Sequence, residues 1–561
     1  MLKIVPSLKE LRDALYSREF RQYLCNVTGS GHVSGKKTDM AINVYTSGCH
    51  LLCHDDVIGS RRISYILYLT DPETPWKEEW GGALRLYPTK TVTSVDGAKV
   101  MLPSADHSKS IPPAFNQLSF FAVQPGQSFH DVEEVYADED LEPGKDQPDR
   151  VRLAISGWYH VPQEGEEGYS DNNEDDMVNK SSLAQLGGGG QEHDRPQKSM
   201  LLYSSKDLQE TPKSQAAESG LDFSESDLEF LLQFIAPTYL TPDALSEVSA
   251  TFEEECSIVL DKFLSNKFSD RLREYIQSAE SNPKPSRAAD WEVACPPHKC
   301  RYKYQRALSS DHFSPIQELL QQLIPSSAFR KWFYAATGYI LKSHDLVARR
   351  FRRGKDYTLA QSYEEDEPRV EICLSITPTM GWGDESAEAE IDPPTEAGSN
   401  EASKPEVNGT TEKRDVGGYL VYMAGDEDDS DDEASNHGVE IPADMSTGGR
   451  ATRGKKPKAD PAVYQAREDE DDGMLFSMPA GWNKLGIVLR DKGTMRFVKY
   501  VSRSAKGDRW DVFGELEIED NDEDDNEDNP DDETRGVENA RDYSENENVP
   551  ESDHSDSSTD D

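Results

Sequence analysis

Apolar residues in the first 162 positions follow two patterns, which predict a β-rich unit opening with a helix. The apolar positions between Leu8 and Leu24 have helical spacing. Downstream, apolar runs short enough for single strands are separated by turns rich in Gly, Pro and Asp. These runs are AINVY from residue 41, ISYILYLT from 63, ALRLYP from 83, QLSFFAV from 117 and VRLAISGWYHV from 151. Many short strands with such turns favour a β-sandwich or barrel over residues 1–162.

A second patterned unit covers residues 221–517 and again places helices before short strands. The predicted helices lie in LDFSESDLEFLLQFI, LTPDALSEVSATFEEECSIVLDKFLSNKFSDRLREYIQ and SPIQELLQQLIPSSAFRKWFYAATGYIL. The predicted strands lie in DLVARRFRR, VEICLSITPTMGW, GGYLVYMAG, WNKLGIVLRD, TMRFVKYVS and WDVFGELEI. Polar, mostly acidic inserts interrupt the unit near residues 382–415 and 425–470. The repeated order of elements hints at a duplicated β fold.

Charge separates these units from the segments around them. The chain has 60 basic and 107 acidic residues and a net charge of −47, and only 35% of its residues are hydrophobic. The linker at 163–220 and the tail at 518–561 are acidic and have little to bury, so we expect them to be disordered. A strong acidic excess repels phosphate backbones, which argues against a direct nucleic-acid surface. A basic protein partner remains compatible with it.

The number of cysteines and the lengths of the apolar runs indicate the cellular compartment. Seven cysteines in 561 residues are too few for a disulfide scaffold, and a reducing compartment fits best. No apolar run is long enough to be read as a secretory signal or a membrane span. We therefore expect a protein of the cytoplasm or nucleus without a membrane partner. The basic stretch GRATRGKKPK from residue 449 is either a nuclear-import signal or a solvated patch.

One stretch carries the residue types of an iron site. In GCHLLCHDD, His54 and Asp56 are two positions apart, so in a strand both side chains would point to one face. His130 in QPGQSFHDVEEV is the candidate for a third ligand. Two imidazoles and one carboxylate on one face of iron leave positions open for co-substrate and oxygen. The spacing alone is weak evidence for a metal site, because His554 and Asp556 repeat it in the acidic tail. The alternative is a polar pair at a strand end that is satisfied by its neighbours.

A basic residue downstream suits a dicarboxylate. Arg152 begins the strand-like run VRLAISGWYH. A buried arginine there could pair bidentately with a distal carboxylate, which is worth about 1.5–3 kcal/mol for charged hydrogen bonds. Arg150 lies on the same face and competes for this role, and a surface arginine at a strand start is the plain alternative.

The motifs HLLCHDDVIGSRRISYILYLTDP, EEWGGALRLYP, SFFAVQPGQSFHDVEEV and RLAISGWYH together resemble a known family. They are similar to the fungal and animal prolyl hydroxylases that act on the decoding-centre protein of the small ribosomal subunit, whose fungal members are also called termination and polyadenylation proteins. The resemblance is strong over residues 1–162 and looser over 221–517, where it includes SRAADW and MGWGDE. It implies a mainly β fold with flanking helices, built as tandem double-stranded β-helix (jelly-roll) domains, of which the first is catalytic and the second is not.

The resemblance also implies roles for individual residues. His54, Asp56 and His130 would bind Fe(II), and Arg152 would bind the distal carboxylate of 2-oxoglutarate. Tyr45 and Tyr68 match tyrosines that line the co-substrate pocket; without the resemblance we would read both as ordinary half-buried strand aromatics. Iron, 2-oxoglutarate as co-substrate and ascorbate are the expected cofactors.

The implied activity is hydroxylation of a proline in the ribosomal decoding protein. This modification would affect the termination or accuracy of translation. Translation termination factors are further candidate partners. Some family members are linked to oxygen sensing. The alternatives are a non-enzymatic scaffold in translation termination or mRNA decay, with an inert first unit, and an oxygenase that acts on a histone or transcription factor. Binding of 2-oxoglutarate separates the scaffold from the enzymes.

Two departures from the family bear on activity, and one feature of the second unit agrees with the family. Relatives carry roughly a hundred more residues before the first metal ligand, so we expect an N-terminally truncated first unit with unpaired sheet edges. The spacing from His130 to Arg152 is longer than in the family, which we attribute to an acidic loop. After residue 351 the only histidines are His437 and His554, both in polar acidic stretches, so the strands of the second unit cannot repeat a two-histidine site.

A second cluster of metal-binding residue types invites comparison with a zinc site. Cys295, His298 and Cys300 lie close together in the sequence. They offer only three ligands, and no second pair has zinc-site spacing, so a structural loop is preferred.

Overall fold

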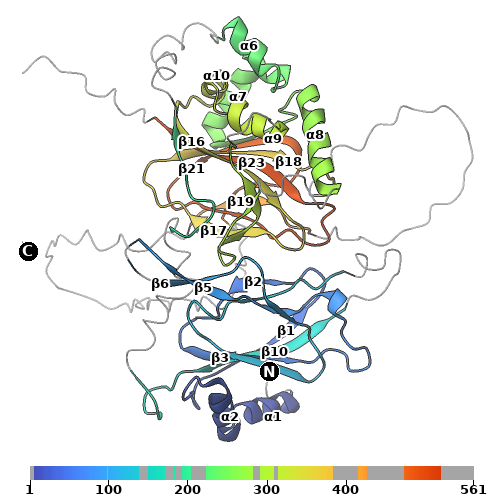
Figure 1. Cartoon of the computed structure of the whole chain (residues 1–561), viewed down its shortest axis with the longest axis vertical. Helices are drawn as coiled ribbons and strands as arrows, with labels where there is room; N and C mark the ends of the chain where they lie inside the picture. The colour runs from blue at the N-terminus through green and yellow to red at the C-terminus, as the bar shows by residue number, and fades with distance from the viewer. Residues whose placement is uncertain are drawn as a thin grey trace, which may run out of the picture. The chain divides into compact units, whose positions relative to one another are not determined.

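The alternating segments of the first 160 residues pair into two antiparallel four-stranded sheets. The computed structural model describes residues 5–95, 97, 99–137, 150–170, 182, 192–203, 223–281, 291–308, 314–382, 415–425 and 473–519. The acidic tail, nearly all of both inserts and most of the predicted linker lie outside these residues. Within them the structure is mainly β, as expected, with helices against two of the sheets (Figure 1).

The first sheet has the order β1-β10-β3-β8. Its strands are β1 (Thr38–Tyr45), β10 (Arg152–His160), β3 (Arg61–Tyr68) and β8 (Gln117–Ala122). Its outer face packs against two short helices, α1 (Pro6–Leu15) and α2 (Arg18–Thr28), through an apolar cluster that includes Leu24, Tyr65 and Tyr159. The sequence predicted helical spacing from Leu8 to Leu24, but Ser17 interrupts it and caps α2 by accepting a hydrogen bond from the amide of Phe20.

The second sheet has the order β2-β9-β4-β7. Its strands are β2 (Leu51–His54), β9 (His130–Val132), β4 (Leu84–Leu86) and β7 (Lys109–Ile111), and a separate hairpin joins β5 (Thr89–Thr93) to β6 (Lys99–Pro103). Of these strands, the apolar pattern had indicated only β4. Strands of three or four residues are too short for alternation to stand out from chance.

The second half of the described chain is built on an eight-stranded sheet. Its main path is β12-β21-β18-β23-β16-β15-β13, and β11 pairs with β16. The strands are β11 (Leu201–Leu202), β12 (Ser257–Asp261), β13 (Glu292–Val293), β15 (Lys303–Gln305), β16 (Leu341–Phe351), β18 (Arg369–Ile376), β21 (Trp482–Arg490) and β23 (Arg509–Ile518). One face is covered by α6 (Glu225–Leu231), α7 (Pro242–Glu255), α8 (Asn266–Ser281), α9 (Pro315–Glu318), a π-helical turn (Leu319–Leu323) and α10 (Ser327–Thr337) (Figure 1).

A five-stranded sheet packs against the other face of the eight-stranded sheet. Its order is β14-β17-β22-β19-β20, with β14 (Cys300–Arg301), β17 (Tyr357–Ser362), β22 (Met495–Val498), β19 (Leu420–Met423) and β20 (Met474–Met478). A buried apolar cluster lies between the two sheets, with Phe351 and Phe513 from the larger sheet and Tyr422 and Val498 from the smaller. That this half repeats the first as a second jelly roll stays a prediction, as do the domain boundaries.

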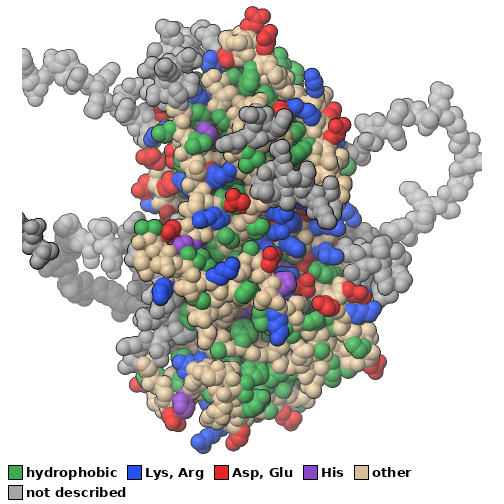
Figure 2. Space-filling view, in the orientation of Figure 1, with side chains coloured by type: hydrophobic (Ala, Val, Ile, Leu, Met, Phe, Trp, Pro, Cys, Tyr) green, Lys and Arg blue, Asp and Glu red, His purple; other side chains and the backbone are tan. Residues whose placement is uncertain are grey.

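The surface charge and the lengths of the helices are relevant to protein and membrane partners. Acidic and basic side chains both occur on the face drawn in Figure 2, with apolar ones scattered among them. In the part of the chain that the structure describes, no helix is both long and apolar enough to cross a membrane.

Candidate metal centre

Three residues predicted to bind metal meet beside the second sheet. His54 ends β2, His130 begins β9, and the two are direct partners across the strand pair, with ring centroids 4.2 Å apart. One ligand atom from each of His54, Asp56 and His130 lies within 4.8 Å of the others. In the described parts of the chain, this is the one such group of histidine, cysteine or acidic residues, and Cys295 and Cys300 belong to none.

The backbone reason for this meeting differs from the expected one. Asp56 lies beyond the end of β2, and its φ of 62° places it in the left-handed region rather than in an extended strand. The rule that residues two apart share a strand face therefore does not apply to it. A turn returns the carboxylate to the imidazoles, with His54 Nε2 3.2 Å from Asp56 Oδ1 and His130 Nε2 3.6 Å from Oδ2.

Backbone carbonyls orient both imidazoles. His54 Nδ1 lies 2.7 Å from the carbonyl oxygen of Leu52, and His130 Nδ1 lies 2.8 Å from that of Ser128. A carbonyl can only accept, so each Nδ1 carries a proton, and in the neutral imidazole each Nε2 keeps its lone pair on the side of Asp56. This is the tautomer that a histidine needs to bind a metal through Nε2.

The Asp56 carboxylate is held from the first sheet. Ser64 Oγ donates to Asp56 Oδ2 at 2.5 Å, and Trp158 Nε1 donates to the same oxygen at 3.2 Å. The Arg61 guanidinium stacks 3.7 Å above the Trp158 ring and reaches within 3.9 Å of Oδ1. The contacts that fix Oδ2 thus leave Oδ1 turned toward His54.

Charge distributes unequally over the three groups. Burial alone would raise the pKa of Asp56, but the adjacent His130 and His54 and the Ser64 hydroxyl hold it well below its usual value. Burial opposes protonation of His54, yet its contact with Asp56 raises the pKa of that imidazole. Burial and the neighbouring His54 lower the pKa of His130 to about 4. The side chain of His54 is also the more exposed, at 27% against 5% for His130.

Arg152 lies at the start of β10, deep in the first sheet. It is 2% exposed, its register partner is Tyr45 at the end of β1, and its guanidinium carbon lies 4.9 Å from the Tyr45 ring centroid and 5.0 Å from that of Tyr68. Burial raises the pKa of Tyr68, which keeps its phenol protonated. Within the described residues, the Tyr68 hydroxyl and Arg152 Nη2 are buried without a hydrogen-bond partner.

These unpaired atoms fit a carboxylate. A buried guanidinium nitrogen and a phenol hydroxyl are both donors, and leaving them unmatched is costly. A carboxylate oxygen would satisfy both, as the distal end of 2-oxoglutarate would. The two-histidine, one-carboxylate set likewise fits Fe(II) with open positions.

The rival arginine takes a different place. Arg150 precedes β10, and its guanidinium lies 4.2 Å from the ring centroid of Trp80. Burial lowers the pKa of Arg150. The position facing Tyr45 and Tyr68 thus belongs to Arg152.

Sequence reasoning missed four residues of this site: Arg61, Ser64, Trp158 and Gly82. Ser64 and Trp158 lie on adjoining strands and are register partners, and Trp158 is three alternations from Arg152. Alternation from Arg152 inward could have indicated Trp158. The role of Gly82, whose carbonyl accepts a 2.7 Å hydrogen bond from Arg152 Nε, depends on pairing that only the fold establishes.

Comparisons with known proteins agree with this chemistry. Residues 40–160 match the 2OG-Fe(II) oxygenase superfamily, and residues 226–524 match the family described as oxoglutarate and iron-dependent oxygenase degradation C-term. The latter match covers more than half of the chain.

Three relatives align along most of their length. The chain is 30% identical over 525 residues to prolyl 3,4-dihydroxylase OGFOD1 of Ostreococcus tauri, covering 91% of this chain and 83% of that one. It is 25% identical over 505 residues to prolyl 3-hydroxylase OGFOD1 of Mus musculus, covering 89% and 75%, and 26% identical over 508 residues to that of Xenopus laevis, covering 89% and 74%. The chain therefore belongs to the OGFOD1-type family of prolyl 3-hydroxylases and 3,4-dihydroxylases, and is an oxygenase that uses Fe(II) and 2-oxoglutarate.

Proposed function

We propose that this protein hydroxylates a proline in a protein substrate, with Fe(II) held by His54, Asp56 and His130. The observation that carries the proposal is the convergence of these three ligand atoms within 4.8 Å, in a unit that also buries an unpaired guanidinium nitrogen and phenol. Arg152 and Tyr68 would bind the distal carboxylate of 2-oxoglutarate, and Tyr45 would pack against Arg152.

The residues of this chain have distinct tasks in that reaction. When bound, Fe(II) and 2-oxoglutarate supply oxidative decarboxylation coupled to insertion of one oxygen atom into a C–H bond of the substrate. The chain fixes both imidazoles through their Nδ1 protons and holds one carboxylate oxygen by Ser64 and Trp158. We propose that the peptide approaches on the side of His54, whose side chain is 27% exposed. Ascorbate would keep the metal reduced between turnovers.

The substrate class follows from the relatives, which are named prolyl 3-hydroxylase or prolyl 3,4-dihydroxylase. We propose the decoding-centre protein of the small ribosomal subunit as the substrate, with an effect on translation termination or accuracy, in the cytoplasm or nucleus. The chain's net charge of −47 suits a basic partner. We further propose that the second half is non-catalytic, and in its described residues no two-histidine, one-carboxylate group occurs.

Coupled turnover tests this function. Purified full-length protein is incubated with Fe(II), 2-oxoglutarate and a proline-containing peptide of the ribosomal decoding loop, beside His54→Ala and the exposed control His32→Ala. We expect succinate and a product one oxygen heavier with wild type and His32→Ala, and neither with His54→Ala. Turnover without peptide, or equal turnover with a histone peptide, would contradict the ribosomal protein as the substrate. If the folded protein neither produces succinate nor binds 2-oxoglutarate, the enzyme function fails and the non-enzymatic scaffold is favoured.

A further inference from the structure

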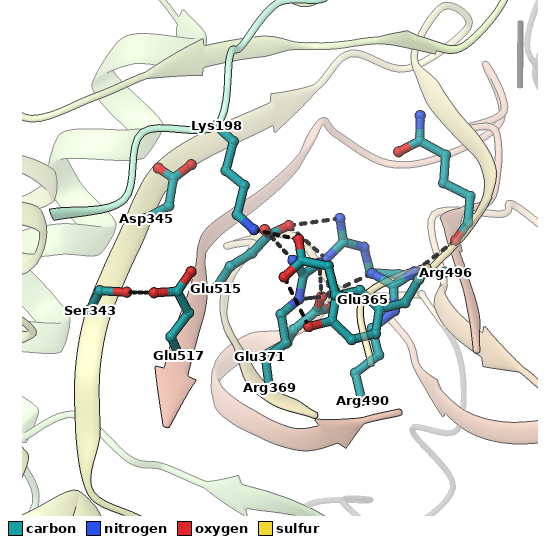
Figure 3. A network of polar contacts seen from close by, with 12 residues as sticks. Lys198, Ser343, Asp345, Glu365, Arg369, Glu371, Arg490, Arg496, Glu515 and Glu517 are labelled. Carbon is teal, nitrogen blue, oxygen red and sulfur yellow. Dashed lines mark hydrogen bonds and ion pairs between the residues drawn. The ribbon is translucent and has the colours of Figure 1, made fainter. Parts of the chain in front are cut away.

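A polar cavity lies in the second half of the chain, and none of the three metal ligands lines it. It has a volume of about 320 Å³, and strands of both sheets of that half contribute to its wall: β16, β18, β21 and β23 from the larger sheet, β17 and β22 from the smaller. Residues 194–198 line it as well. This volume is at the low end of the range for small-molecule sites. Figure 3 shows the charged side chains that converge there.

Three arginines in this cavity share two carboxylates. Arg369, Arg490 and Arg496 all contact the fully buried Glu371, at 2.6 Å, 2.9 Å and 2.6 Å. Arg369 and Arg496 also contact Glu515, at 2.9 Å and 3.2 Å. Burial and the two neighbouring guanidiniums lower the pKa of Arg490, whereas Glu371 and Glu515 outweigh burial and raise the pKa of Arg369 and Arg496. This cluster carries three positive and two negative charges.

A second cluster reaches the cavity through Arg349 and also has more arginines than carboxylates. Arg349 and Arg509 both contact Asp511, at 2.7 Å and 3.1 Å, and all three side chains are buried. Arg349 uses Nε and Nη2 for this contact. Its Nη1 makes no hydrogen bond to the described residues, and Arg349 lines the cavity. Two guanidiniums therefore share one carboxylate.

The remaining charged residues that line the cavity do not offset this excess of positive charge. Lys198 pairs with Glu365, Arg306 with Asp345, and Lys299 with Asp194. Arg195 and Glu364 also line the cavity and balance each other in the count. Glu517, on the same face of β23, accepts a hydrogen bond from Ser343 and is not among the lining residues. The lining groups and their direct partners, counted together with Arg509, which shares Asp511 with Arg349, thus keep an excess of two positive charges. The chain as a whole has a net charge of −47.

Aromatic rings fix the guanidiniums in place. Arg349 and Arg496 lie 4.1 Å and 4.5 Å from the ring centroid of Phe513, and Arg369 lies 4.5 Å from that of Tyr363. Rings on one side and carboxylates on the other leave little freedom for rotation, so the remaining donors are preorganised. An uncompensated buried charge is strongly destabilising, and an anion that supplies the missing charge would relieve it.

We propose that this cavity is a binding site for a small dianion whose charged groups are carboxylates or phosphates. Planar guanidiniums recognise both groups by paired hydrogen bonds, and two excess charges match a dianion. Its arginines come from β16, β18, β21 and β22, so the site is separate from the one around Arg152 on β10 and independent of the proposed hydroxylation.

Titration calorimetry on the metal-free full chain tests this proposal. The protein carries Arg152→Ala, which removes the other guanidinium available to a carboxylate, and the buffer contains neither phosphate nor carboxylates. Succinate and inorganic phosphate are the two probes. We expect saturable binding of one of them at a single site, and the one that binds identifies the charged group.

Charge-matched variants decide where the anion binds. Arg490→Met and, separately, Arg349→Met each leave their cluster with equal numbers of positive and negative charges, so each protein is expected to fold. Each should weaken the anion at least tenfold, about the value of one charged hydrogen bond. Arg350→Met is the control, because Arg350 lies on the same strand but pairs one-to-one with Asp508. Binding of neither probe, or binding unchanged in both variants, would overturn the proposal.

Discussion

Arg152 Nε donates a 2.7 Å hydrogen bond to the carbonyl oxygen of Gly82, and this contact ties the start of β10 to the loop before β4. Gly82 has a φ of +72°, and a Cβ there would lie 2.9 Å from Arg152 Cδ. A side chain at position 82 would therefore both strain the backbone and displace the guanidinium.

Gly82→Ala should raise the KM for 2-oxoglutarate about tenfold, because displacing a positioning group by a fraction of an ångström weakens its contacts steeply. The control is Gly29→Ala, whose φ of +66° gives similar backbone strain but whose Cβ would meet nothing within 4 Å. Steady-state kinetics on both proteins measures the difference. Equal KM values would mean that strain alone, and not contact with Arg152, governs the effect.

Arg152→Lys should raise the KM for 2-oxoglutarate by roughly 10- to 150-fold, which corresponds to about 1.5–3 kcal/mol of charged hydrogen bonding. A lysine cannot form the paired contact of a guanidinium. Arg150→Lys, beside Trp80, is the matched control and should change the KM little. Metal affinity, measured with Mn(II), should stay the same in both, and a joint loss would indicate misfolding.

Ser64→Ala and Trp158→Phe should each weaken Mn(II) binding by about 10- to 100-fold, because outer-shell partners hold a ligating carboxylate in position. Both donate to Asp56 Oδ2, and removing either frees the carboxylate to rotate. Ser17→Ala serves as the comparison: loss of this helix cap should cost about 1 kcal/mol of stability without changing metal affinity. Undiminished metal binding in both site variants would assign them a structural role only.

Metal affinity should fall in acid in two stages. The pKa of His54 is raised above its ordinary value and that of His130 is lowered to about 4, so His54 takes a proton first as the pH decreases. Because only a neutral imidazole binds metal, the logarithm of the Mn(II) association constant should fall with a slope of about one per pH unit below the His54 pKa. The slope should approach two only below the His130 pKa of about 4. A constant affinity from pH 7 to 5 would contradict the assignment of His54.

Glu371→Gln should destabilise the protein by about 3–5 kcal/mol, since it removes a buried charge shared by three arginines. Urea denaturation measures this loss. Glu365→Gln is the control, because its pair with Lys198 is half exposed and should contribute under about 1 kcal/mol.

The same group predicts a pH dependence. The pKa of Glu371 is well below its ordinary value in the folded state, so its stabilisation is present at neutral pH and is lost as the pH falls through the acid range. Glu371→Gln should therefore flatten the acid side of the stability curve. An unchanged acid limb would show that other carboxylates control it.

The sequence by itself determined the class of the protein and the identity of its candidate ligands. Alternation of apolar residues indicated β10, β3 and β8, because long strands with one buried face leave a period of two in the chain. Residue types around His54, Asp56 and His130 pointed to iron, since that donor set is chemically distinctive. Their roles as ligands stay predictions, although the structure brings their atoms together.

Only the tertiary structure decided how these groups meet. Asp56 reaches the imidazoles through a left-handed turn and not along a strand, and Arg152 rather than Arg150 is buried beside Tyr68. The surplus of arginines over carboxylates at the polar cavity of the second half likewise arises from strands far apart in the chain. Burial and charge balance depend on which distant segments pair, and local residue patterns do not contain that information.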